Sequence, residues 1–542
     1  MLKPLLDVKN LSVRFGQGEG SFLALDGFEL TVAKGETVVL VGESGSGKSI
    51  SALSISRLLP STALIESGSI EFAGSDLLGL PEKAMRNIRG AGIGMVFQEP
   101  QSSLNPVMTI GSQIGESLKR HHGLYGKSLL ERIEELLVLV GISNPKHRCR
   151  QYPHEFSGGM KQRVMIAIAL AGDPELLIAD EPTTALDVTI QAQVLSLMKA
   201  IQTNRNMGMI FITHDLAVAY QVADRIIVMK EGKIIEAADR EDFYRTPSHE
   251  YTRKLFDSIP SWEKRLSENP SADHPAAEKA LNVKNLSVSF LGKTSLFSRR
   301  SNSMVAVDNV DLELQEGRTL ALVGESGSGK TTMAKAILQL IKPSHGSVYY
   351  RGDNLCDVSG RQLRRHRGDL QMVFQDPYSS MNPRMLVGAI IKEGMIAQNI
   401  GINESERDDR VRRLLLQVGL DPSYALRYPH EFSGGQRQRI CIARALAVEP
   451  KVLICDEPTS ALDVSVQSQI LHLLRGLQEE LGLTYLFVTH NIGVVAYLAH
   501  QVAVMHQGKI VEYGSVDDVL HRPQHVYTRT LLNAVPKIGM SL

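Results

Sequence analysis

The feature that most constrains the fold is an internal duplication. The octapeptide VGESGSGK occurs at residues 41–48 and again at residues 323–330. Four further pairs of segments recur in the same order: 94–106 with 371–383, 152–159 with 428–435, 176–188 with 452–464, and 211–218 with 487–494. From His154 to the end of each copy, the offset stays at 276 residues (430 − 154). A constant offset over such a distance indicates that a whole domain occurs twice.

The chain has 542 residues, and single hydrophobic cores stop growing at about 250–300 residues. We therefore predict two domains, at residues 1–260 and 280–542. Residues 261–279 are rich in proline, serine and charge and show no periodic apolar pattern, which is typical of a linker. A flexible linker of this length spans about 25 Å, so the two domains are able to meet.

Composition argues against several classes of protein. Lys and Arg total 59, as do Asp and Glu, so the formal net charge is zero and no nucleic-acid partner is predicted. Residues 1–15 lack the apolar core of a signal peptide, and no apolar run reaches the ~18–20 residues of a membrane span. The four cysteines form no C-x-x-C pair, so neither a disulfide framework nor a zinc site is expected. We expect a cytosolic chain that contacts a membrane only through partners.

Strand and helix patterns alternate within each copy, which is typical of an α/β domain. In the first copy, short apolar runs predict buried strands, and apolar residues at helical spacing after the octapeptide predict a helix that stops at Pro60. A hairpin is predicted with its turn at Glu231 and Gly232. Residues 112–151 are expected to form a helical subdomain.

The octapeptide has the composition of a phosphate-binding loop. Its glycines allow successive backbone N–H groups to point inward at a phosphate, and the helix that follows adds its positive N-terminal end. A lysine at the end of the loop reaches the β- and γ-phosphates, and the next hydroxyl ligates Mg²⁺. The predicted residues are Gly42, Ser44, Gly45, Ser46, Gly47, Lys48 and Ser49 in the first copy, and Gly324, Ser326, Gly327, Ser328, Gly329, Lys330, Thr331 and Thr332 in the second.

A carboxylate pair ends an apolar strand in each copy, Asp180 with Glu181 and Asp456 with Glu457. In isolation, such a pair is as easily a solvated loop. Because both pairs lie downstream of a phosphate-binding loop, we predict that the aspartates face the metal ion. The glutamates are then placed to polarise an attacking water.

Two further polar positions recur in both copies. His214 and His490 each follow an apolar strand and a threonine, where a lone histidine is more often structural than catalytic. We assign both to catalysis, with the structural interpretation left open. Gln98 and Gln375 each leave a strand, and a glutamine there is unremarkable unless it reaches the metal, as we predict for these two.

Together these motifs resemble the nucleotide-binding domain of ABC transporters, and the resemblance covers both halves apart from the linker. It implies two tandem P-loop domains, each with a RecA-like core, an antiparallel β part and a helical subdomain. It also implies that Phe15 and Phe290 stack on adenine, and that the glutamine loops at Gln98 and Gln375 contribute to the Mg²⁺ site. The remaining ATP-binding residues implied are Ser157, Gly158, Gly159, Asp187, Ser433, Gly434, Gly435, Gln436 and Asp463.

In this family two domains pair head to tail, so the resemblance implies two composite ATP sites. Lys48 is expected to face the segment Ser433–Gln436, and Lys330 the segment Ser157–Met160. Met160 stands where the second copy has the family's usual Gln436. We therefore predict that both sites hydrolyse ATP and that the Lys330 site is the slower one.

Finer motifs indicate a branch of the family. The segments QEPQSSLNP, QDPYSSMNP and YPHEFSGG, together with the matching ends at 246–260 and 522–536, resemble oligopeptide, dipeptide and nickel importers. Fusion of two ATPases in one chain is similar to Yej-type peptide (microcin C) uptake systems and to glutathione importers. No cysteine follows Cys149 in the first half or Cys455 in the second, so the iron–sulfur cluster of some members is not expected.

The resemblance implies an ATPase that drives peptide import with two integral-membrane permeases and a periplasmic peptide-binding protein. Its implied location is peripheral, at the cytoplasmic face of the bacterial inner membrane. Glutathione or nickel remains an alternative cargo. A tandem ABC ATPase acting on ribosomes as a translation factor is a different alternative, but that class usually has a long charged helical arm between its domains. Residues 261–279 are short and interrupted by proline, which favours the importer.

Overall fold

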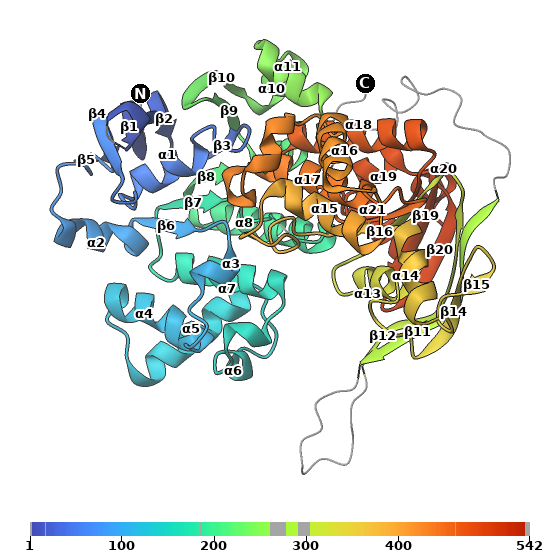
Figure 1. The fold of residues 1–542 in the computed structure, drawn as a ribbon. Helices are drawn as coiled ribbons and strands as arrows, with labels where there is room; N and C mark the ends of the chain where they lie inside the picture. The colour runs from blue at the N-terminus through green and yellow to red at the C-terminus, as the bar shows by residue number, and fades with distance from the viewer. Residues whose placement is uncertain are drawn as a thin grey trace. The chain divides into compact units, whose positions relative to one another are not determined.

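The computed structural model describes residues 3–16, 18–184, 186–260, 278–290, 304–460 and 462–536. The chain forms two compact units, one built from residues up to Asp257 and one built chiefly from Ser258–Val535 (Figure 1). The domain boundaries given above remain predictions. Residues 261–277 of the predicted linker lie outside the described residues, and a strand begins at Lys279, the last position assigned to that linker.

The core of the first half is a mixed sheet around a parallel centre. In spatial order its strands are β10 (Lys233–Asp239), β9 (Arg225–Lys230), β3 (Thr37–Val41), β8 (Gly208–Ile212), β7 (Leu176–Asp180) and β6 (Ile93–Val96). Strands β6, β7, β8, β3 and β9 run parallel, whereas β10 pairs antiparallel with β9. Every residue of β3, β7 and β8 is buried, which explains their continuous apolar sequences.

The second half repeats this sheet. Its strands are, in spatial order, β16 (Leu370–Val373), β17 (Val452–Asp456), β18 (Thr484–Thr489), β13 (Thr319–Val323), β19 (Gln501–His506) and β20 (Lys509–Ser515). The directions match as well, since β20 alone of the named pairs in this sheet runs antiparallel.

A four-stranded antiparallel sheet accompanies each core. The strands are β2 (Phe22–Val32), β1 (Leu6–Phe15), β4 (Ala63–Phe72) and β5 (Ser75–Asp76) in the first half, and β12 (Met304–Gln315), β11 (Lys279–Phe290), β14 (His345–Tyr350) and β15 (Asp353–Asn354) in the second. Their inner faces join the apolar cluster beneath the core sheet. The antiparallel part predicted for each copy is therefore confirmed.

The helices also occur in matching sets. The first half contains η1 (Gly18–Gly20), α1 (Lys48–Ile55), α2 (Glu82–Ala91), α3 (Pro100–Ser103), α4 (Ile110–His122), α5 (Gly126–Leu139), α6 (Pro145–Arg148), η2 (Pro153–Glu155), α7 (Gly158–Leu170), α8 (Val188–Arg205), α9 (Leu216–Val222), α10 (Arg240–Arg245) and α11 (Glu250–Asp257). The second contains α13 (Lys330–Ile337), α14 (Gly360–Asp369), α15 (Val387–Ala397), α16 (Glu404–Gln417), η3 (Pro422–Leu426), η4 (Pro429–Glu431), α17 (Gly434–Leu446), α18 (Val464–Leu481), α19 (Ile492–Leu498), α20 (Val516–His521) and α21 (Val526–Asn533). Within the described ranges, no helix combines the length and the apolar character needed to cross a membrane.

The predicted helical subdomain is present. Figure 1 shows α4, α5 and α6 grouped at the opposite end of the first half from β1, β2 and β4. Helix α1 ends at Ile55, earlier than the predicted stop at Pro60, because Arg57 takes a left-handed φ of 50° that a helix does not accommodate. The predicted hairpin turn is confirmed: Glu231 and Gly232 have φ of 50° and 79°, the signs a tight two-residue turn requires.

Candidate functional site

The phosphate-binding loops leave the central strand of each core sheet and lead into α1 and α13. Gly42 has φ of 155°, and a Cβ there would lie 2.3 Å from the Met229 carbonyl oxygen. Gly47 has φ of 101°, and its Cβ would lie 2.8 Å from the Ala24 carbonyl oxygen. Only glycine fits these two positions, so the neighbouring strands force the loop to curl over the start of α1.

The loop lysines are buried beneath this curl. Nζ of Lys48 donates to the carbonyl oxygens of Gly42 at 2.8 Å and Glu43 at 2.7 Å. Nζ of Lys330 makes the matching bonds in the second half, both at 2.8 Å. Burial lowers the pKa of Lys330 despite the acidic groups around it. Each ammonium is therefore held inside its loop, where an anionic group is its natural partner.

A hydroxyl and a carboxylate face each other beside each lysine. Oγ of Ser49 donates to Oδ1 of Asp180 at 3.1 Å, and Oγ1 of Thr331 donates to Oδ1 of Asp456 at 3.0 Å. Burial raises the pKa of Asp180 to about 6 and also raises that of Asp456. A buried carboxylate next to a hydroxyl is an oxygen donor pair that suits a hard cation such as Mg²⁺.

No set of three or more His, Cys, Asp or Glu side chains in the described part of the chain is arranged to hold a metal ion. A cation at this position would therefore take one hydroxyl and one carboxylate from the protein, and the rest of its oxygens from phosphate and water. Such sparse protein ligation is the usual mode for Mg²⁺ at nucleotide sites.

Glu181 is at the centre of a hydrogen-bonded cluster. Nε2 of Gln98 and Oγ1 of Thr184 both donate to Oε2 of Glu181 at 2.9 Å. Nδ1 of His214 lies 3.2 Å from Oε1 of the same carboxylate. Three segments that are far apart in the sequence thus converge on one side chain. Gln98, Glu181 and His214 were each predicted, and the structure brings them together.

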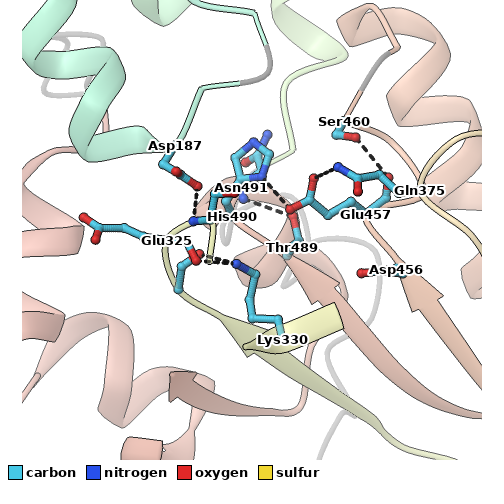
Figure 2. Close-up of polar contacts among 12 residues, drawn as sticks. Asp187, Glu325, Lys330, Gln375, Asp456, Glu457, Ser460, Thr489, His490 and Asn491 are labelled. Carbon is cyan, nitrogen blue, oxygen red and sulfur yellow. Dashed lines mark hydrogen bonds and ion pairs between the residues drawn. The ribbon is translucent and has the colours of Figure 1, made fainter. Parts of the chain in front are cut away.

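The second half reproduces the cluster around Glu457. Nε2 of Gln375 donates to Oε2 of Glu457 at 2.9 Å, and Nδ1 of His490 lies 3.2 Å from Oε1. Figure 2 shows both side chains pointing toward Glu457. Oγ of Ser460 donates to the Glu457 carbonyl oxygen at 3.1 Å, whereas the matching Thr184 reaches the carboxylate itself. The two clusters therefore differ in one hydroxyl contact.

The two glutamates share an unusual backbone conformation. Glu181 has φ of 45° and Glu457 has φ of 47°, in the left-handed region that side chains disfavour. Their N–H groups donate to the carbonyl oxygens of Ile212 and Val488, at 3.0 and 2.9 Å. Each glutamate thus extends the sheet by one bond while its backbone turns away from the strand. Strain of this kind is concentrated at functional sites.

The charge of the glutamates is set by opposing effects. Burial raises the pKa of Glu181, but the hydrogen bond and charge of His214 and the bond from Thr184 outweigh it, and the pKa falls to about 2. Burial lowers the pKa of His214, and Glu181 more than restores it. The pKa of Glu457 is lowered by the same balance. Both carboxylates are therefore ionised at neutral pH, as a proton acceptor must be.

The segments Ser157–Met160 and Ser433–Gln436 are the signature segments of the two halves, and the serine of each caps the signature helix that follows it, α7 or α17. Oγ of Ser157 accepts from the Met160 N–H, and Oγ of Ser433 accepts from the Gln436 N–H, both at 3.4 Å. In the second half, the Ser433 N–H also donates to Oε1 of Gln436 at 3.0 Å, which completes a reciprocal capping box. Met160 has no side-chain oxygen, so the first half lacks that second bond.

In the second half, the signature helix lies beside the glutamate cluster. A cavity of about 160 Å³ is lined by residues that include Gln375, Tyr378, Gly434, Arg437 and Glu457. It connects the glutamine loop, the start of α17 and the end of β17 in one hollow.

These paired sites agree with the comparisons. The family described as ABC transporter matches residues 25–184 and 307–460, more than half of the chain. The chain belongs to the ABC transporter family. It is an ATPase with two ATP-binding cassettes, as predicted. A second family, described as oligopeptide/dipeptide transporter, C-terminal region, matches residues 235–283 and 511–541 of this ABC ATPase.

Two curated relatives match nearly the whole ABC ATPase. The peptidoglycan transport ATP-binding protein YejF of Agrobacterium fabrum is 49% identical over 98% of this chain and 96% of its own length. The glutathione import ATP-binding protein GsiA of Pectobacterium atrosepticum is 44% identical over 98% of this chain and 90% of its own length. Among solved structures, a dimeric post-hydrolysis state of the ATP-binding cassette MJ0796, bound to ADP and Pi, covers 44% of this chain at 31% identity, with a TM-score of 0.40.

Four other predicted residues lie at the ends of strands or at the starts of helices. Asp463 caps α18 by accepting from the Val466 N–H at 3.0 Å, and Asp187 directly precedes α8. The ring of Phe15 stacks on that of Phe22 at 5.3 Å, whereas Phe290, the last residue of β11, is 44% exposed. The predicted roles of these residues in nucleotide binding stay predictions.

One contact of the Glu181 cluster was not predicted from the sequence. Thr184 donates to the carboxylate of Glu181, although its sequence context, shortly after a proline, is that of an ordinary turn residue. The available signal was the duplication, because a hydroxyl recurs at the matching position as Ser460. The capping box at Ser433 and Gln436 had a clearer signal, the S-x-x-Q spacing before an apolar helix.

Proposed function

We propose that this ABC ATPase hydrolyses ATP at two sites to drive the import of peptides. The observation that carries the proposal is the full-length similarity to YejF and GsiA, with the phosphate loop, carboxylates, histidine and signature complete in both halves. The two matches to the oligopeptide/dipeptide transporter C-terminal region support the peptide branch. The GsiA match makes glutathione, itself a tripeptide, the main alternative cargo.

In the proposed reaction, the loop amides and Lys48 hold the β- and γ-phosphates of ATP. Glu181 accepts a proton from the attacking water at one carboxylate oxygen, while Gln98 and His214 keep that carboxylate oriented. Lys330, Glu457 and their partners act in the same way at the second site.

The proposed metal is Mg²⁺, held by Ser49 with Asp180 and by Thr331 with Asp456. When bound, Mg²⁺ neutralises charge on the phosphates and fixes their geometry. The raised pKa of Asp180 fits this role, because a buried carboxylate gains most from a nearby cation. The proposed contributions of Gln98 and Gln375 to the metal are less direct, since both amides donate to the glutamates.

We propose that the two sites are composite, each combining the loop of one half with the signature of the other. Support comes from the duplication, because each half supplies one phosphate loop and one serine-capped signature helix. In the proposed arrangement, the Lys48 loop pairs with Ser433–Gln436 and the Lys330 loop pairs with Ser157–Met160. ATP would then join the halves, and hydrolysis would separate them.

The proposed partners are two integral-membrane permeases and a periplasmic binding protein for the peptide. This places the ATPase at the cytoplasmic face of the bacterial inner membrane, attached through the permeases. Closure of the halves on ATP would be transmitted to the permeases as a switch between two states.

The test is an affinity purification of the tagged full chain from native membranes in mild detergent, with mass spectrometry of the proteins that co-purify. Two permeases in near-equal amounts, encoded beside a periplasmic binding protein, are the expected result. Ribosomal proteins without permeases would replace the importer with a translation ATPase. Phosphate release by the purified chain is measured in parallel, so that a failure of ATP hydrolysis is distinguished from a wrong partner.

A further inference from the structure

The C-terminal segment of the second half is fixed against the core sheet by a carboxylate. Glu512, in β20, accepts from the N–H groups of Gln524 at 2.7 Å and His525 at 3.0 Å. Nε of Arg529 then donates to the Pro523 carbonyl oxygen at 3.0 Å. These bonds fix the start of α21, which lies in the region that matches the oligopeptide/dipeptide transporter family.

This fixed segment places Tyr527 against the phosphate-binding loop. The N–H of Glu325 donates to the Tyr527 hydroxyl oxygen at 3.1 Å. The ring of Tyr527 stacks on His506, the last residue of β19, with ring centres 3.9 Å apart and planes 30° apart. The side chain of Tyr527 is therefore positioned by its own helix and by the stacking of its ring on His506.

Glu325 is also bonded to other residues of the phosphate loop through its backbone. Its carbonyl oxygen accepts from Nζ of Lys330 at 2.8 Å and from the Ser328 N–H at 3.1 Å. The N–H of Glu325 is therefore bonded to Tyr527, and the carbonyl oxygen of the same residue is bonded to Lys330. Loss of the bond to Tyr527 would allow the carbonyl oxygen to move away from the lysine.

We propose that Tyr527 is a positioning residue for nucleotide binding, which holds the Lys330 loop in its phosphate-binding form through the backbone of Glu325. The proposal rests on the proposed role of that loop in binding the phosphates. The C-terminal segment of this chain would then act on the ATP site that is built on the phosphate loop of its own half.

Two observations show that the contact suits this role. Burial raises the pKa of Tyr527 to about 12, so the hydroxyl stays neutral and its bond to the loop persists across the physiological pH range. In the first half, the matching Tyr251 has Lys230 at 5.1 Å from its ring centre, where the second half has His506. The tyrosine thus recurs, whereas the side chain that supports its ring differs between the halves.

The test is calorimetric titration of the full chain with ADP and Mg²⁺, which avoids turnover during the measurement. All variants carry Lys48→Ala, so that binding reports on the Lys330 loop. Tyr527→Phe keeps the ring and removes the hydroxyl. We expect it to raise the Kd for ADP about three- to tenfold, the value of one hydrogen bond, with the melting temperature unchanged.

Three further variants make the result specific. Tyr513→Phe removes a hydroxyl that bonds to Gln501 and Glu313, away from the loop, and should leave the Kd unchanged. Glu512→Gln should raise the Kd and add little to Tyr527→Phe, because both act through the same hydroxyl. Lys330→Ala should abolish binding. If it does not, the role of the loop is wrong. If it does, and Tyr527→Phe changes the Kd less than twofold or no more than Tyr513→Phe does, the positioning role is wrong.

Discussion

At the scale of single residues, Glu181 and Glu457, the proposed proton acceptors, have a backbone conformation that costs stability. Both have a positive φ, and both receive bonds from a glutamine and a histidine on other segments. The surrounding strands overdetermine this conformation, since the glutamate N–H groups are fixed to β8 and β18. In each half, the fold therefore tolerates a strained backbone at this residue, and the strained backbone orients the carboxylate.

The proposed catalytic role of Glu457 predicts a loss of turnover without a loss of ATP binding. Glu457→Gln removes the proton acceptor but keeps the size and the bond to Gln375. Because hydrolysis at either proposed site requires the two halves to separate and close again, a block at the slower site should also slow the other, and ATPase activity should fall below half of wild type. Combined with Glu181→Gln, it should fall by about 100-fold or more. Phosphate release measures the rate, and Glu175→Gln, which alters an exposed ion pair with Lys34, serves as the control. Activity above half for Glu457→Gln would show that its site contributes little.

The backbone strain at Glu457 makes a separate prediction about stability. Glu457→Gly and Glu457→Ala remove the same side-chain contacts, but only glycine accepts φ of 47° without cost. The glycine variant should therefore be more stable than the alanine variant by about 1 kcal/mol, or about 2–4 °C in melting temperature. Differential scanning calorimetry measures the melting temperatures of the two variants. Equal melting temperatures would mean that the strain is relieved in some other way.

At the scale of elements, one buried carboxylate fixes the end of the first half. Glu236, in β10, accepts from the N–H and hydroxyl of Ser248 at 2.7 and 2.8 Å, from the His249 N–H at 3.1 Å, and from the Thr252 hydroxyl. Glu512 takes the matching place in the second half. Helices α11 and α21 are too short to be stable alone, so these carboxylates account for their fixed positions.

This arrangement predicts a pH-dependent cost for Glu236→Gln. Burial raises the pKa of Glu236, but hydrogen bonds from Thr252 and Ser248 outweigh it, so the folded pKa lies below the ordinary 4.5. The stabilisation is then present above pH 4.5 and is lost as pH falls through the folded pKa. The variant should lose about 1–3 kcal/mol at pH 7, and less at pH 3.5. Urea unfolding at both values measures this, with the exposed Glu241→Gln as control. If the difference in free energy of unfolding between wild type and Glu236→Gln is as large at pH 3.5 as at pH 7, the prediction is wrong.

The signature helices carry the next prediction. Ser433 and Gln436 form a capping box, whereas Met160 has no side-chain oxygen and cannot form one with Ser157. Met160→Gln should complete the box and stabilise the first half by about 0.5–1 kcal/mol, and Gln436→Met should have the opposite effect. Calorimetry measures both variants. If Gln436→Met destabilises while Met160→Gln changes nothing, the two helix starts are not equivalent, and the predicted weakness of the Lys330 site loses its structural basis.

At the scale of the whole molecule, the internal duplication determined which site residues could be predicted from the sequence. Motifs that recur in the same order in both halves, such as the Lys48 loop and the strand end at Asp180, were located because chance does not place a whole series of motifs twice. The positive φ of Glu181 could not be predicted, because it arises from strands that are distant in the sequence. The contact between Tyr527 and Glu325 was equally hidden, since nothing local to either residue indicates the other. Local chemistry is readable from sequence, whereas its tertiary support is not.

The proposal that the two ATP sites are composite makes a prediction about the molecule as a whole. In a background of Glu181→Gln with Glu457→Gln, the chain should retain about two ATP molecules through gel filtration, because binding is kept and hydrolysis is not. Adding Lys48→Ala should leave about one. Adding Ser433→Arg to that variant should still leave about one, since both changes strike the same proposed site. Adding Ser157→Arg instead should leave none.

The two matched quadruple variants, which differ only in whether Ser433 or Ser157 is replaced by arginine, separate the two possible arrangements. If each half formed its own site, the outcomes would be reversed: Ser433→Arg with Lys48→Ala would remove both ATP molecules, and Ser157→Arg with Lys48→Ala would spare one. Circular dichroism and the melting temperature confirm that each variant is folded. Because both arginine substitutions replace a helix-capping serine in the same motif, their local cost is matched, and a difference in retained ATP reports on pairing. A reversed outcome would assign each phosphate loop to the signature of its own half and leave the duplication without a role in building the site.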